Sequence, residues 1–109
     1  MTTDNGSIPE VSPVEASGRI SAGAWAVDVR EVFEWDEGRI ADAVHNPLGL
    51  IQDWWQDLPR DRDVVIYCRT GARSGRAVAA LVNAGVDNVV NLAGGIEAWV
   101  ESGLPIEEP

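Results

Sequence analysis

The sequence predicts one α/β domain with three layers, in which a parallel sheet carries helices on both faces. Short apolar runs alternate along the chain with amphipathic segments, and this order is typical of strand–helix–strand units. The run Val64–Tyr67 (VVIY) is apolar at every position, as expected for a strand that helices cover on both sides. Ligands of such folds gather at the carboxyl ends of the strands.

The first half of the chain contains one predicted strand and two predicted helices. Trp25–Val29 is short and rich in valine, which favours a strand. Glu31–Glu37 is a short polar helix candidate that ends at Gly38. Leu50–Leu58 places leucine, isoleucine and tryptophan side chains on one helical face and is closed by Pro59.

The second half continues the alternation after the VVIY strand. Ser74–Ala84 is predicted to be a helix, because its alanine, valine and leucine side chains share one face and Gly85 follows. Asn88–Leu92 is a short, valine-containing run of the strand type. A last helix is predicted at Ile96–Ser102, where Gly103 ends it.

The length of 109 residues is sufficient for one compact domain. We expect a flexible N-terminal tail at residues 1–7, the domain at 8–106 and a short acidic tail at 107–109. The opening residues have neither a basic start nor an apolar core of signal-peptide length, and no apolar run approaches the length of a membrane span. The sequence therefore predicts a cytoplasmic monomer that does not bind membranes.

Composition excludes several classes of function. There are 18 acidic and 8 basic residues, the formal net charge is −10, and every basic residue is an arginine. This balance argues against nucleic-acid binding, which needs a broad basic surface. The chain has one cysteine, Cys68, and one histidine, His45, so an intramolecular disulfide, a CxxC pair and a Cys/His metal cage are excluded. We expect neither a metal nor a cofactor.

The stretch that carries chemistry begins at Cys68, directly after the VVIY strand. The small residues Gly71, Ala72 and Gly75 allow the following loop to curl so that backbone N–H groups point inward. The helix predicted from Ser74 adds its positive amino end. Such a cradle stabilises the thiolate over the thiol, so the sulfur is expected to be nucleophilic near neutral pH.

Charge around this loop differs from that of the whole chain. No acidic residue occurs from Val64 to Val86, whereas Arg69, Arg73 and Arg76 all lie in that span. Three arginines can recognise a small oxyanion with paired donors. The alternative interpretation is that Cys68 is a buried small apolar residue and that the arginines only solubilise a helix. The order of strand, cysteine, glycine loop and helix favours the reactive thiol.

The chain resembles a single-domain rhodanese, a member of the thiosulfate sulfurtransferase family, from about Val11 to Ile106. Three motifs carry the resemblance: VDVREVFEWDEGRIADAVHNPL, VVIYCRTGARSGRAVAALVNAGVDNVVNL and GGIEAWVESGLPI. Within them, Cys68 falls on the catalytic cysteine of the family, and the following Arg-Ser pair is Arg73 and Ser74. The pattern departs from the family at Arg39, which stands where the family usually has histidine.

The resemblance implies a five-stranded parallel sheet and a double-displacement reaction through a cysteine persulfide. Cys68 would take the sulfane sulfur of thiosulfate or a persulfide donor and pass it to cyanide, to a thiol or to a partner protein. No cofactor is implied. The substrate cradle would be formed by the loop residues Arg69, Thr70, Gly71, Ala72, Arg73 and Ser74, with the two arginines orienting the anionic donor.

Several residues near the predicted site are expected to be structural. The spacing of Asp28 and Arg30 at a strand end indicates an ion pair that holds the strand to a neighbouring turn. The resemblance places Gly94 and Gly95 beside the loop as structural positions. His45 is interpreted as a structural histidine. For Trp55, burial against a loop and a substrate or partner contact at the rim both remain open.

Two other functions are weighed against sulfur transfer. A catalytically weak module that binds or presents sulfur to a partner would not need to keep the intact CRTGARS loop. A small cysteine phosphatase or arsenate reductase has its arginine six positions after the cysteine, whereas here that position is Ser74 and Arg73 is the fifth. The shorter loop and the missing second thiol favour sulfur transfer.

Overall fold

The computed structural model describes residues 8–109, so the tail expected at residues 1–7 lies outside the described residues. Five strands form one sheet in the order β1-β5-β4-β2-β3, and every neighbouring pair is parallel. The strands are β1 (Glu10–Val11), β2 (Trp25–Asp28), β3 (Val44–His45), β4 (Val64–Tyr67) and β5 (Val89–Leu92). The predicted α/β class and the parallel sheet are confirmed.

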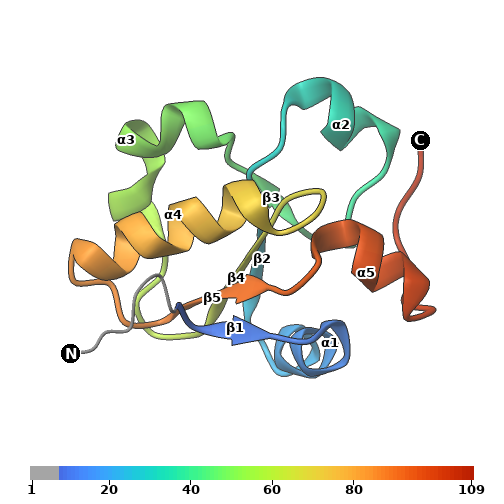
Figure 1. Cartoon of the computed structure of the whole chain (residues 1–109), viewed down its shortest axis with the longest axis horizontal. Coiled ribbons are helices and arrows are strands. Elements are labelled where there is room, and N and C mark those ends of the chain that lie inside the picture. Colours follow the sequence, from blue (N-terminus) through green and yellow to red (C-terminus); the bar gives the residue numbers. More distant parts are fainter. Residues whose placement is uncertain (1–7) are drawn as a thin grey trace.

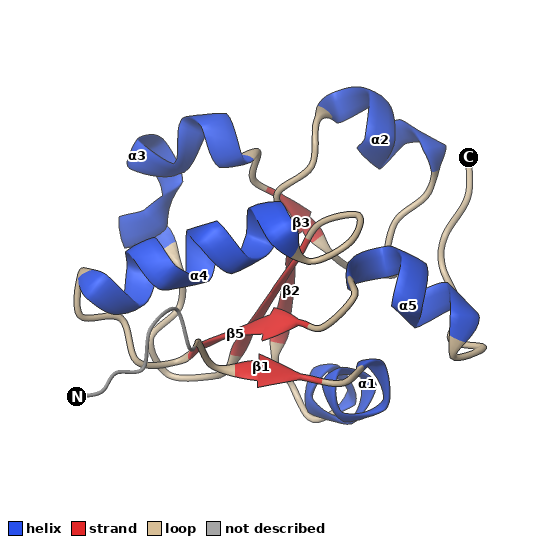
Figure 2. Ribbon diagram, in the orientation of Figure 1, coloured by secondary structure: helices blue, strands red, loops and turns tan. Residues whose placement is uncertain are grey.

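Helices cover both faces of this sheet (Figures 1 and 2). On one face, α3 and α4 pack over the central strands, and on the other face α1 and α5 lie together. The short helix α2 lies beyond the carboxyl ends of the strands (Figure 1). The helices are α1 (Pro13–Ser21), α2 (Val32–Glu37), α3 (Ile51–Trp54), α4 (Ala72–Asn83) and α5 (Gly95–Glu101), with 3-10 turns at Leu48–Leu50 and Trp55–Asp57.

The core explains why β4 is apolar throughout. Val64 and Ile66 pack in the cluster beneath α3 and α4, whereas Val65 and Tyr67 pack in the cluster beneath α1 and α5. All four side chains are fully buried, because alternate residues of a strand point to opposite faces and both faces are covered. The central position of β4 puts the residue after it, Cys68, in the middle of the carboxyl edge of the sheet.

Some boundaries differ from the predicted ones. The segment predicted as one helix at Leu50–Leu58 is a short α-helix with a 3-10 turn on each side, although Trp54 and Leu58 are buried as the pattern requires. Helix α4 begins at Ala72 rather than at Ser74. The earlier start places residues 72 and 73, which were expected in the loop, in the first turn of the helix.

Helix α1 and the strands β1 and β3 were not predicted from periodicity. Helix α1 nevertheless has a start signal in the sequence: Pro13 occupies its first turn, and the Ser12 hydroxyl accepts a hydrogen bond from the Glu15 N–H at 3.2 Å. Strands β1 and β3 have two residues each, too few for any alternation to be visible. They are held by pairing with the edges of the sheet.

The C-terminal segment is attached to the domain beyond the predicted boundary. Ile106 packs against the core, and Glu107, expected in the acidic tail, forms an antiparallel bridge with Arg39 through backbone hydrogen bonds of 2.9 and 2.7 Å. Across residues 8–109, no helix is long and apolar enough to cross a membrane.

Candidate active site

Cys68 lies directly after β4 and is only 1% exposed. The loop that follows is short, because α4 already begins at Ala72. Gly71 makes the turn into the helix with a left-handed φ of 101°, and a Cβ atom there would come within 3.3 Å of the Gly94 backbone nitrogen. Glycine is therefore required at the point where the loop passes β5 and turns back over the sulfur.

Two donors lie close to the Cys68 sulfur. The Gly71 N–H is 3.1 Å from Sγ, and the Ser74 hydroxyl is 3.3 Å from it. Burial of the sulfur raises the pKa of the thiol, but hydrogen bonds from the Ser74 hydroxyl and from the backbone N–H groups of residues 70, 71 and 74 lower it. The lowering prevails, so the pKa of Cys68 lies below its ordinary value and the loop favours the thiolate.

The arginines of the loop are paired with carboxylates from other parts of the chain. Both Nη atoms of Arg73 donate to the Glu34 carboxylate of α2, at 2.8 and 2.9 Å. These hydrogen bonds lower the pKa of Glu34 to about 2, although its burial acts in the opposite direction. Arg69 donates to Glu97 of α5 at 3.1 Å, but this pair is open to water, with Arg69 64% exposed. The stretch without acidic residues is thus partly neutralised in the fold.

The first turn of helix α5 is hydrogen-bonded to the start of the loop. The Ile96 N–H donates to the Cys68 carbonyl at 2.9 Å, and the Glu97 N–H donates to the Arg69 carbonyl at 3.1 Å. This approach requires Gly95, whose φ is 65°: a Cβ atom there would lie 2.6 Å from the Cys68 carbonyl oxygen and would overlap the Arg69 carbonyl. Gly94 has a similar constraint, because its added Cβ would lie 2.5 Å from the Cβ of Ala98.

Asp28 and Arg30 form a buried ion pair at the end of β2. The Arg30 guanidinium donates to both carboxylate oxygens of Asp28 at 2.8 to 3.1 Å and to the Gly38 carbonyl at 2.6 Å. Asp28 is 0% exposed and Arg30 is 5% exposed. The pair joins the carboxyl end of β2 to the turn after α2, the helix that provides Glu34.

His45 and Arg39 both contact the ring of Trp35. The His45 ring stacks on Trp35 with centroids 4.8 Å apart, and His45 Nε2 lies 2.8 Å from the Arg30 carbonyl oxygen. The Arg39 guanidinium, at the position where the family usually has histidine, also lies over the Trp35 ring, at 4.2 Å. Trp55 is partly buried against the core beneath α3 and α4. All four side chains therefore have packing contacts.

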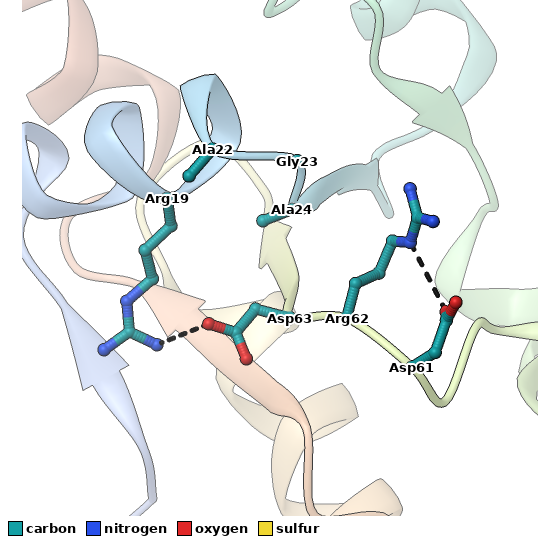
Figure 3. Close-up of a pocket in the computed structure, with 7 residues that line it drawn as sticks. All are labelled: Arg19, Ala22, Gly23, Ala24, Asp61, Arg62 and Asp63. Carbon is teal, nitrogen blue, oxygen red and sulfur yellow. Dashed lines mark hydrogen bonds and ion pairs between the residues drawn. The ribbon is translucent and has the colours of Figure 1, made fainter.

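Figure 3 shows a pocket of about 500 Å³. The pocket lies at the amino ends of β2 and β4, whereas Cys68 follows the carboxyl end of β4. It is lined by Ala24 and Asp63, which precede β2 and β4, and by Arg19 at the end of α1. Figure 3 shows the ion pairs of this pocket, Arg19 with Asp63 and Arg62 with Asp61, both at 3.4 Å. Asp61 and Asp63 are therefore part of a solvated, ion-paired turn. Within the described range, no three His, Cys, Asp or Glu residues group as a metal site.

Three residues of the site were not identified from the sequence. Glu34 and Glu97 reach the loop from separate helices, and no local pattern indicates that they meet Arg73 and Arg69. The third is Asn91, which is 2% exposed and accepts a hydrogen bond of 2.6 Å from the Ser74 hydroxyl. A polar residue within the apolar run of β5 was a signal that could have identified it.

The fold and the loop together define an α/β protein whose cysteine thiolate is stabilised at the carboxyl edge of a parallel sheet. A model of the rhodanese-like domain matches residues 12–102 of the chain. A sulfurtransferase of Allochromatium vinosum is 51% identical over 83 residues, which cover 76% of this chain and 78% of that protein. The putative sulfur carrier protein YrkF of Bacillus subtilis is 30% identical over 95 residues, covering 85% of this chain and 51% of the relative.

Solved structures agree with the sequence relationship. The crystal structure of a rhodanese-related protein from Thermoplasma volcanium has a TM-score of 0.84 and 33% sequence identity, covering 91% of this chain and 97% of that one. The chain therefore belongs to the rhodanese-like sulfurtransferase family.

Proposed function

We propose that the protein moves a sulfane sulfur from thiosulfate or a persulfide donor to a thiophilic acceptor through a persulfide on Cys68. The Cys68 thiolate attacks the outer sulfur of thiosulfate. A bond forms between Sγ and that sulfur, the sulfur–sulfur bond of thiosulfate breaks, and sulfite leaves with the bonding electron pair. Cyanide or a thiolate then attacks the outer sulfur of the persulfide, and the Cys68 thiolate is restored.

The observation that carries the proposal is the pair of donors at the sulfur. The Gly71 N–H at 3.1 Å and the Ser74 hydroxyl at 3.3 Å stabilise negative charge on Sγ in the resting protein. The same curled backbone is suited to an anionic persulfide, whose charge lies on the outer sulfur. The cycle needs no second thiol and no cofactor, which agrees with a sequence that has a single cysteine.

The two arginines that the sequence assigned to donor binding have different roles in this proposal. Arg69 is exposed and its ion pair with Glu97 is weak in water, so it is free to orient an incoming oxyanion. Arg73 is held by two hydrogen bonds to Glu34, and its side chain is 30% exposed. We therefore assign the first contact with the sulfonate group of thiosulfate to Arg69, with Arg73 contributing its charge to the loop.

The test is a two-step reaction with a Cys68→Ser control. Wild-type protein is incubated with thiosulfate, desalted and measured by intact mass, and the expected result is the addition of one sulfur atom. Cyanide is then added and thiocyanate is measured; the added mass should disappear as thiocyanate forms. Cys68→Ser should show neither step. Equal behaviour of wild type and Cys68→Ser would contradict the proposed function.

A sulfur carrier without independent turnover is the second candidate, because the relative YrkF is described as a putative sulfur carrier protein. The same experiment distinguishes the two. A carrier would gain sulfur and release it only to a partner protein, whereas the proposed enzyme turns over repeatedly with small acceptors. A phosphatase is disfavoured, because both Nη atoms of Arg73 are engaged by Glu34. Hydrolysis of p-nitrophenyl phosphate by wild type and not by Cys68→Ser would support it instead.

The cellular setting is part of the same proposal. A free thiolate is maintained most readily where thiols stay reduced, as in the cytoplasm. The donor is a small anion or a persulfide, and the acceptor is a thiol or a protein that carries one.

A further inference from the structure

Asn91 connects the active-site serine to the outer edge of the sheet. It lies on β5, which pairs with both β1 and the central strand β4. Its side chain is 2% exposed and accepts a hydrogen bond from the Ser74 hydroxyl at 2.6 Å. Its amide nitrogen donates to Glu10 of β1 at 3.0 Å and to the Gly71 carbonyl at 3.2 Å. The proposed function assigns no role to Asn91 or Glu10.

These contacts fix the orientation of the Asn91 amide. Its nitrogen faces two acceptors, the Glu10 carboxylate and the Gly71 carbonyl. If the amide turned over, its oxygen would face both of them without a proton between. The Asn91 oxygen must therefore point toward Ser74, and a buried amide oxygen needs a donor there.

Ser74 cannot satisfy both of its neighbours with one proton. Its Oγ atom lies 2.6 Å from the Asn91 oxygen and 3.3 Å from the Cys68 sulfur, and a hydroxyl has a single hydrogen to donate. A neutral Cys68 thiol can donate to the Ser74 oxygen while the Ser74 hydroxyl donates to Asn91. The Cys68 thiolate is an acceptor instead, and a hydroxyl proton that turns to the sulfur no longer reaches the Asn91 oxygen.

We propose that Asn91 is a positioning residue whose amide oxygen competes with the Cys68 sulfur for the hydroxyl proton of Ser74 and thereby opposes ionisation of the thiol. Asn91 does not touch the sulfur; it acts through Ser74. Hydrogen bonds from the loop N–H groups then favour the Cys68 thiolate, whereas the Asn91 oxygen disfavours it. The balance between these two effects sets the pH above which Cys68 is ionised and reactive. The inference rests on the ionisation of Cys68, which the proposed function uses.

Other charged groups near the same loop also influence the ionisation of Cys68. They are Arg69 in the loop, Arg73 on α4, Glu34 on α2, Glu97 on α5 and Glu10 on β1. Arg69 and Arg73 are each paired with a glutamate, so their charges are partly compensated. Glu10 is exposed and contacts Asn91 rather than the sulfur. Glu10→Gln is therefore a control for charge at the far end of the Asn91 side chain.

The test measures the rate of Cys68 alkylation by iodoacetamide as a function of pH and needs no sulfur transfer. Asn91→Leu keeps the size of the side chain and removes the acceptor, and we expect the midpoint of the rate profile to fall by about 0.5 to 1 pH unit. Ser74→Ala should raise the midpoint. In a protein that already carries Ser74→Ala, Asn91→Leu should not lower the midpoint, because the hydroxyl proton for which the sulfur and Asn91 compete is absent. Glu10→Gln should leave the midpoint nearly unchanged.

A second measurement needs only the wild-type protein for its main result, so it stands even if a variant does not fold. The side-chain amide NMR signals of Asn91 should titrate with the Cys68 midpoint in wild type. Where Ser74→Ala folds, the Asn91 signals should lose that titration. The inference is overturned if Asn91→Leu does not lower the midpoint, if it lowers it equally without the Ser74 hydroxyl, or if the wild-type Asn91 signals stay constant across the midpoint. Because thiocyanate formation is not measured, failure here is distinct from failure of the proposed function.

Discussion

Replacing Arg73 by alanine should destabilise the protein in a manner that depends on pH. The substitution leaves the Glu34 carboxylate, 8% exposed, without the two hydrogen bonds that it accepts from the guanidinium. A fall of the Glu34 pKa from its ordinary 4.5 to about 2 corresponds to at most about 3 kcal/mol of unfolding free energy. Arg73 is 30% exposed, so water screens the pair, and we expect a loss of about 2 kcal/mol near neutral pH.

The sign of the pH dependence follows from the lowered pKa. As the pH falls, the unfolded chain takes up the Glu34 proton first, at about its ordinary pKa of 4.5, and the folded protein takes it up only near 2. The stabilisation is therefore present above 4.5 and is lost between 4.5 and about 2. Across that window, the difference in stability between wild type and Arg73→Ala should narrow.

Urea unfolding followed by tryptophan fluorescence measures this difference, since the chain has five tryptophans. Curves are collected for wild type and Arg73→Ala at a series of pH values from neutral downward. Arg76→Ala removes an exposed arginine of the same helix and should change the unfolding free energy by less than about 0.5 kcal/mol. A loss that is the same at every pH, or no larger than that of Arg76→Ala, would refute the reasoning.

Three further predictions concern the loop and its support. Gly95→Ala should lower the unfolding free energy measured in urea by about 2 to 4 kcal/mol, because it adds backbone strain and separates α5 from the loop. Gly18→Ala, in open space on α1, should not lower the unfolding free energy. Equal losses in the two variants would contradict this explanation. The rate of Cys68 alkylation should reach its plateau at a lower pH than that of an unstructured cysteine peptide, and coincident profiles would exclude stabilisation by the loop. Arg69→Ala should raise the KM for thiosulfate about threefold to tenfold with little change in urea stability, as expected for an exposed charge that contacts an anion; an unchanged KM would remove Arg69 from donor binding.

The centre of the fold could be predicted from the sequence because its signals are local. Val64–Tyr67 is apolar on both faces of a strand, and Cys68 follows it directly, so burial pattern and chain order alone place the thiol at the edge of the sheet. The need for glycine at position 71 is also local, because the turn into α4 has a positive φ.

The remaining features depend on contacts between distant segments. Glu34 is 39 residues from Arg73 in the sequence, and nothing in the local charge pattern shows that α2 brings its carboxylate to the loop. For the same reason, the acid-free span around Cys68 overstated the positive charge at the site. Strands β1 and β3 are too short for periodicity and form only because an existing sheet edge is available to them.

The two hydrogen bonds from α5 to the carbonyls of Cys68 and Arg69 have a consequence for the order in which the chain is made. During synthesis the cysteine leaves the ribosome before Gly95–Glu101, and domains complete their packing only when their last elements have emerged. The nascent chain therefore has the whole CRTGARS segment before it has the helix that holds this segment in shape. A chain interrupted before Gly95 would keep Cys68 but lack the two hydrogen bonds that hold the carbonyls of Cys68 and Arg69, so the loop around the thiol would be fixed only after α5 has been made.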